Sequence, residues 1–101
     1  MKLALMVLEE NSKTKESNKQ DSFEKIAVKL TEEYTELMEA IEEGDNKHIA
    51  EETWDIIQVT IRALALLRER GMDLEELNYN HNKKLTERGW VANGFASIKV
   101  R

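Results

Sequence analysis

Two stretches of nearly equal length decide the fold. Residues 21–43 read DSFEKIAVKLTEEYTELMEAIEE, residues 47–70 read KHIAEETWDIIQVTIRALALLRER, and only Gly-Asp-Asn separates them. In both, apolar residues recur every three or four positions, which predicts amphipathic helices. Each helix would be about 35 Å long. The three-residue connection is too short for any arrangement except antiparallel neighbours. The expected apolar stripes are Ile26, Leu30, Leu37 and Ile41 in the first helix, and Ile49, Ile56, Val59, Ala63 and Leu66 in the second.

A third, shorter helix is expected after the second. Asp73 is placed to cap it, with Glu76 three residues later as in a capping box, and the helix runs to about Glu87. The tail after Trp90 differs, because residues 95–100 alternate weakly between apolar and polar. We therefore expect an all-α antiparallel helical bundle with a short irregular or β-like C-terminal tail. The other expected start and stop residues are Asp21 or Ser22, Gly44, Asp45 or Asn46, Gly71 and Gly89.

Composition limits the classes of protein to consider. The 101 residues fit one domain, expected over 1–101 with its core at about 21–90. Twenty acids against fifteen Lys and Arg give a formal charge of −5, which argues against a nucleic-acid partner. The absence of cysteine excludes disulfides, thiolate zinc sites and a cysteine nucleophile.

Length and hydropathy give further expectations. A chain this short builds a modest core, so we expect a homodimer or homotetramer. No apolar run approaches the ~20 residues of a membrane span. The apolar run at residues 3–8 is followed by two acids, which is unlike a signal peptide. We expect a cytoplasmic protein with no membrane partner, and a polar loop at residues 11–20.

Half of the chain's acids lie in residues 32–55. Two of them, Glu33 and Glu52, fall on the apolar seams of their helices. An unpaired buried carboxylate costs several kcal/mol, so such groups are paired, protonated or bound to metal. The acids are Glu32, Glu33, Glu36, Glu39, Glu42, Glu43, Asp45, Glu51, Glu52 and Asp55.

The spacing of these acids predicts a metal site. Glu33 and Glu36 share a helix face, as do Glu52 and Asp55. Glu36 lies eight residues before Gly44 and Glu52 eight residues after it, so an antiparallel hairpin brings the pairs level. Four carboxylates without His or Cys suit Mg²⁺ or Mn²⁺ better than zinc or copper. A surface cluster without metal is the alternative.

The segments Glu32-Glu33-Tyr34-Thr35-Glu36-Leu37 and Glu51-Glu52-Thr53-Trp54-Asp55 resemble the signature of the MazG-like all-α nucleoside triphosphate pyrophosphohydrolases. The resemblance covers about residues 24–90. It implies Mg²⁺, with Mn²⁺ as an alternative, held at a nucleotide triphosphate by Glu33, Glu36, Glu52 and Asp55. It also implies substrate phosphate or base binding by a basic segment, here Asn82, Lys84 and Arg88. Favourable charge at a helix C-terminus is the other interpretation of those bases.

The implied reaction is hydrolysis of a nucleoside triphosphate or dNTP to the monophosphate and pyrophosphate. Water is the nucleophile, and Glu36 or Glu52 is the catalytic group expected to take its proton. In this family the site commonly forms between subunits. Two alternatives stay open: phosphoribosyl-ATP as the substrate, and a helical interaction module without enzymatic activity. Tyr34 and Trp54 either stack on a base or pack in the core or at an interface.

Overall fold

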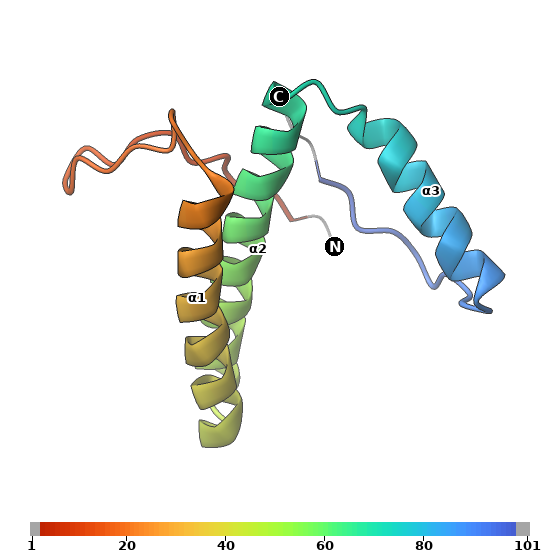
Figure 1. Cartoon of the computed structure of the whole chain (residues 1–101). Coiled ribbons are helices and arrows are strands. Elements are labelled where there is room, and N and C mark those ends of the chain that lie inside the picture. Colours follow the sequence, from red (N-terminus) through yellow and green to blue (C-terminus); the bar gives the residue numbers. More distant parts are fainter. Residues whose placement is uncertain (1–2, 99–101) are drawn as a thin grey trace.

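The computed structural model describes residues 3–98 and contains three helices (Figure 1). They are α1 (Phe23–Glu43), α2 (Asn46–Glu69) and α3 (Leu74–Glu87). Residues 3–98 contain no strand, only an isolated antiparallel bridge between Glu10 and Ser17. The expected all-α class is confirmed. Within the same residues, no helix combines the length and the apolar character that a membrane span requires.

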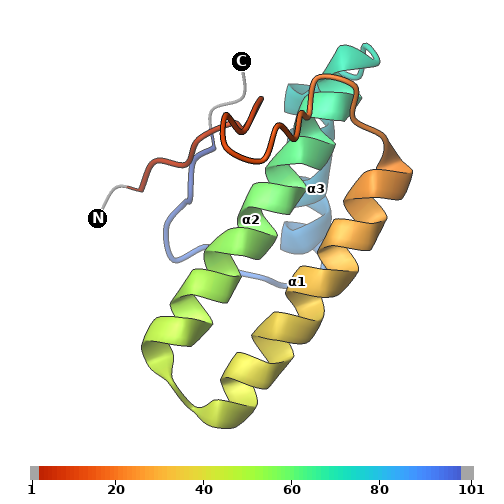
Figure 2. The ribbon, with the colours of Figure 1, turned by 90° about the vertical axis from the view of Figure 1, so that its left-hand side faces the viewer.

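The first two helices lie side by side and antiparallel (Figures 1 and 2). Ile26 of α1 and Val59 and Leu66 of α2 form the buried cluster, against which Phe23 and Ala63 pack. Along the predicted stripe of α1, however, Leu30 is 36% exposed and Ile41 is 50% exposed. Each helix of the hairpin has one long neighbour, so its apolar face is wider than the surface that covers it.

Capping residues define both ends of α1 and the tight turn that leads into α2. Ser22 is the N-cap of α1, and its hydroxyl accepts a hydrogen bond from the Lys25 amide. Gly44 ends α1 at φ +74°, a left-handed conformation that costs glycine little. Asp45 then caps α2 by accepting from the amides of Lys47 and His48. One helix thus ends and the next begins within two residues.

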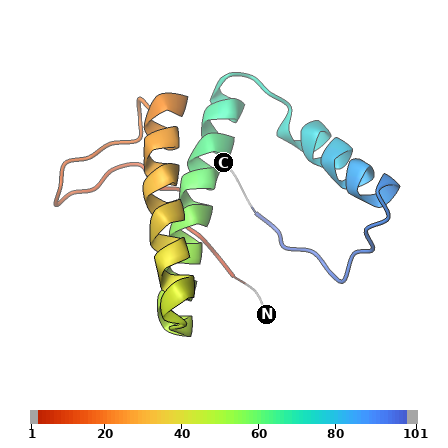
Figure 3. The same ribbon diagram turned by 60° about the horizontal axis from the view of Figure 1, so that its bottom comes forward.

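The third helix stands apart from the hairpin (Figures 1 and 3). It meets α2 only near their connection, does not contact α1, and has no buried residue. Its leucines, Leu74, Leu77 and Leu85, form a narrow stripe, and Leu77 is 43% exposed. The expected bundle is therefore not closed within one chain, because α3 has too little apolar surface to hold itself against α1 and α2.

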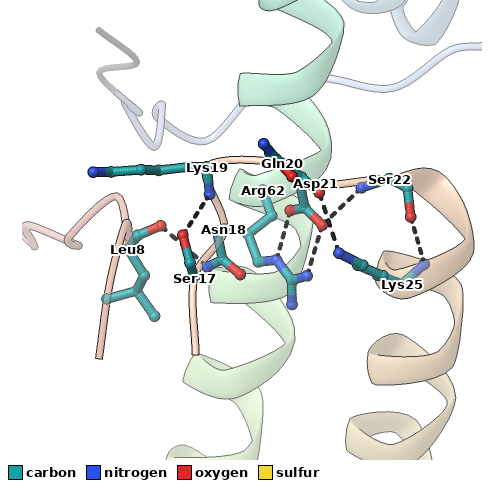
Figure 4. A network of polar contacts seen from close by, with 9 residues as sticks. All are labelled: Leu8, Ser17, Asn18, Lys19, Gln20, Asp21, Ser22, Lys25 and Arg62. Carbon is teal, nitrogen blue, oxygen red and sulfur yellow. Dashed lines mark hydrogen bonds and ion pairs between the residues drawn. The ribbon is translucent and has the colours of Figure 1, made fainter. Parts of the chain in front are cut away.

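The N-terminal segment, residues 3–21, crosses α2 (Figure 2). Asp21, at the end of this segment, accepts two 2.9 Å hydrogen bonds from the Arg62 guanidinium of α2 (Figure 4). That contact lowers the pKa of the Asp21 carboxyl. Both side chains are largely buried, so the pair fixes the segment to α2 before α1 begins.

The tail is irregular as far as it is described. Residues 90–98 form no helix or strand, and Phe95 is 86% exposed. The β-like alternative for residues 95–100 is thus absent at 95–98, while 99 and 100 lie outside the described residues.

Candidate metal centre

Four carboxylates from the two long helices come together across the hairpin seam. α1 supplies Glu33 and Glu36, and α2 supplies Glu52 and Asp55; we call these four the carboxylate cluster. One oxygen from each lies within 4.8 Å of the others. The three-residue spacing and the short turn bring together all four residues that the sequence indicated. Their role as metal ligands stays a prediction.

The cluster has a buried side and an open side. Glu33 is 5% exposed and Glu52 is 9% exposed, whereas Glu36 and Asp55 are exposed. The buried pair occupies seam positions that apolar residues fill elsewhere in the hairpin. A ligand can therefore approach from the side of Glu36 and Asp55 while the buried pair stays fixed.

The two buried glutamates use their oxygens in the same way. In each, Oε1 is paired with a basic side chain one helical turn earlier: Lys29 Nζ lies 3.3 Å from Glu33, and His48 Nε2 lies 3.3 Å from Glu52. The Oε2 atom of each is buried and has no hydrogen-bond partner among the described residues. A buried carboxylate oxygen left without a partner is costly, and oxygen is the ligand that Mg²⁺ and Mn²⁺ prefer. The residues therefore fit a hard cation.

The charges around Glu33 also favour a cation at the carboxylate cluster. Burial raises the pKa of the Glu33 carboxyl; the hydrogen bond from Lys29 opposes this, and the charges of Glu36 and Asp55 raise it further. Burial and the neighbouring negative charges thus both disfavour the ionised form of Glu33. A divalent cation among the four oxygens would remove the repulsion between these charges.

Lys29 and His48 were not among the site residues predicted from the sequence. His48 also lies 3.0 Å from Glu43 through Nδ1, and this contact with Glu43 raises the pKa of the imidazole. The sequence spacing could have indicated both pairs, because each base stands four residues before a glutamate on the seam. Both fix the orientation of a cluster carboxylate without belonging to the cluster.

The predicted phosphate-binding residues are not brought to the cluster. Asn82, Lys84 and Arg88 lie on or just after α3, they are exposed, and α3 does not contact α1. Tyr34 and Trp54, beside the cluster residues in sequence, are 58% and 43% exposed. These two aromatic residues therefore do not pack in the core of one chain, and packing at an interface stays a prediction.

Comparison with known protein families agrees with this geometry. The family model described as the MazG nucleotide pyrophosphohydrolase domain matches residues 21–90. The chain belongs to this family. The matched region begins at Asp21, contains both carboxylate pairs and extends through α3, so it leaves out residues 3–20 of the segment that crosses α2. No curated protein and no solved structure matched the chain.

Proposed function

We propose that this MazG domain is a metal-dependent nucleoside triphosphate pyrophosphohydrolase. The observation that carries the proposal is the pair of buried, unpartnered oxygens on Glu33 and Glu52, within a cluster of four carboxylates. Membership of the family supports the same reaction class. A non-enzymatic helical module offers no reason to bury two carboxylates on the seam.

The chain's own residues have distinct tasks in this reaction. Glu33, Glu36, Glu52 and Asp55 hold Mg²⁺ or Mn²⁺, which supplies charge neutralisation at the phosphates and a lowered pKa for water. Of the two candidates, Glu36 and Glu52, the exposed Glu36 is the better placed to take the proton from the attacking water, because both oxygens of Glu52 would be engaged. Lys29 and His48 keep one oxygen of each buried glutamate occupied, so that the other oxygen is directed to the cation.

The phosphate contacts are proposed to come from a second copy of the chain. Tyr34, Met38 and Ile41 form a stripe at helical spacing on α1, and they are 58%, 44% and 50% exposed. Asn82 and Lys84 lie on α3 and Arg88 is its C-cap, and this helix has no buried residue of its own. Assembly into a homodimer or homotetramer would cover the stripe and place α3 of one copy near the cluster of another.

Product analysis tests the reaction class. The full chain is incubated with canonical and modified NTPs and dNTPs and with phosphoribosyl-ATP, in Mg²⁺, in Mn²⁺ and in excess chelator. Phosphorus NMR should find the monophosphate and pyrophosphate only where metal is present. Release of a nucleoside diphosphate and inorganic phosphate would contradict the proposal, and turnover of phosphoribosyl-ATP alone would change the substrate.

A further inference from the structure

A cavity of about 450 Å³ lies between α2 and the N-terminal loop, which we define as residues 8–18. Asp55 of the carboxylate cluster is part of its wall. Gln58 and Arg62 continue that wall along α2 at spacings of three and four, so all three side chains share one helix face. The cavity therefore begins where the open side of the cluster ends, and its volume is that of a small-molecule site.

The N-terminal loop is held in place by polar contacts. Asn18 Nδ2 donates to the Leu8 carbonyl at 3.1 Å, and Asn11 Oδ1 accepts from the amides of Lys13 and Thr14 at 2.9 and 3.1 Å. The loop then continues to the Asp21–Arg62 pair, so both its own fold and its position on α2 are fixed (Figure 4). This wall of the cavity is thus preorganised.

Among the described residues, Gln58 is the amide in the wall whose side-chain oxygen lacks a hydrogen-bond partner. Its Oε1 atom is buried and accepts no hydrogen bond within residues 3–98. Asn11 and Asn18 also line the cavity, but each uses its side chain to hold the loop. A buried amide oxygen without a donor costs free energy, which a ligand bearing an N–H group would recover.

The charges of the wall select against an anion. Carboxylates outnumber basic side chains four to three. Two of the bases are already paired, Lys29 with Glu33 and Arg62 with Asp21, and one of the acids, Glu10, is paired with Lys19. Leu8 and Val59 add apolar surface. The wall suits a neutral, flat heterocycle that presents hydrogen-bonding groups at its edge, and not a phosphate.

We infer that this cavity binds the nucleobase of the substrate, and that Gln58 reads the hydrogen-bonding edge of the base. A glutamine amide offers an acceptor beside a donor, the pattern with which proteins recognise base edges. The N-terminal loop, which lies outside the region matched by the family, is thereby a part of the specificity site. This inference rests on the proposed function, because Asp55 belongs both to the cluster proposed to hold the metal and to the wall of the cavity.

Nucleosides without phosphate test the cavity independently of turnover. Adenosine, guanosine, cytidine, uridine and thymidine are titrated into the isotopically labelled full chain without metal. At least one should shift the side-chain amide resonances of Gln58 together with backbone amides of residues 8–18. Shifts confined to other parts of the chain, or none with any nucleoside, would overturn the inference even if the chain hydrolyses NTPs.

Base preference tests the role of Gln58. Gln58→Leu should lower kcat/KM for the preferred base about tenfold or more and bring the values for different bases closer together. Gln20→Leu, at the exposed glutamine outside the cavity, is the matched control and should keep the wild-type preference. Metal-dependent turnover with an unchanged preference in Gln58→Leu would overturn the inference while leaving the proposed function intact. If no NTP is turned over, the proposed function fails and the nucleoside titration still decides on the cavity.

Discussion

Glu33 and Glu52 each lower the stability of the fold at the place where their carboxylates are proposed to bind the metal. Each is buried at a seam position, gives one oxygen to a base on its own helix and leaves the other without a donor. A fold selected only for stability would place leucine or alanine there, as it does at Ala40. The metal-free chain therefore carries a stability cost at the place where we expect the cation.

That cost can be measured at Glu33. Because burial and neighbouring carboxylates raise its pKa, ionised Glu33 destabilises the folded state at neutral pH. Glu33→Gln should raise the free energy of unfolding of the metal-free chain by about 1 kcal/mol and abolish its stabilisation by Mn²⁺. Denaturant unfolding with and without Mn²⁺ measures both effects. Glu42→Gln, an exposed acid of α1, is the control that should change neither.

The two bases that hold the buried glutamates should affect metal binding. Lys29→Met and His48→Gln each free an oxygen that is now paired, so the carboxylate loses its fixed orientation. We expect each to weaken Mn²⁺ binding about tenfold, as measured by calorimetry. His81→Gln, on exposed α3, should leave the affinity at the wild-type value. Equal affinities in all three variants would show that neither base positions a ligand.

At the scale of the elements, the turn at Gly44 sets the register that brings the carboxylate pairs level. Its φ of +74° strains any residue with a Cβ, although no atom lies where that Cβ would stand. Gly44→Ala should therefore lower the free energy of unfolding by about 1 kcal/mol through the backbone alone. Thermal or denaturant unfolding checks this. Gly44→Asn should lose less unfolding free energy than Gly44→Ala, because asparagine tolerates the left-handed conformation better than alanine. Equal losses in the two variants would show that backbone strain at Gly44 is not the cause.

The contact between Asp21 and Arg62 should make stability depend on acidity. Arg62 lowers the pKa of Asp21 from its usual value near 3.8, so the contact stabilises the fold fully above that value. As the pH falls through the lowered pKa of the folded state, this contribution is lost. The difference in unfolding free energy between wild type and Asp21→Asn should be constant above about pH 5 and shrink below about pH 4. A difference that stays the same at acidic pH would contradict this account.

The helices and the cluster were predictable because their determinants are local. The two helices α1 and α2 follow from apolar spacing and capping residues. The three-residue connection between them then aligns the two carboxylate pairs across the hairpin. The partners of Glu33 and Glu52 also lie on the same helices, but on an acidic helix a base four residues away is common and carries little information. The separation of α3 and the path of the N-terminal segment depend on tertiary contacts such as Asp21–Arg62, 41 residues apart, which no local pattern encodes.

At the scale of the whole molecule, the described chain is an open structure, with an extent of 43 × 39 × 26 Å. Its buried apolar residues lie mainly along one seam, while Tyr34, Met38 and Ile41 remain uncovered on α1. This exposure is what a subunit looks like when part of its apolar surface belongs to an interface. The basic residues of α3 are likewise exposed, in line with the proposal that they contact the cluster of a neighbouring copy.

Assembly can be tested by one charge on that stripe. Met38→Lys should give monomers in light scattering. A lysine at the centre of an apolar interface would have to bury its charged ammonium group, which costs free energy. Met38→Lys should also raise KM, since the α3 bases of the neighbour would be lost from the site. Met72→Lys, equally exposed in the connection between α2 and α3, is the control that should keep the wild-type mass. A wild-type chain that is monomeric at high concentration would refute the shared site.

We propose above all that the carboxylate cluster holds the metal for pyrophosphate release. The most direct test is the initial rate of pyrophosphate release from the best NTP as Mg²⁺ is titrated, in wild type, Glu52→Gln and Glu51→Gln. We predict a rate that requires Mg²⁺ in wild type, is preserved in Glu51→Gln on the exposed side of α2, and falls at least a hundredfold in Glu52→Gln. A Glu52→Gln variant that releases pyrophosphate at the wild-type rate would contradict the account.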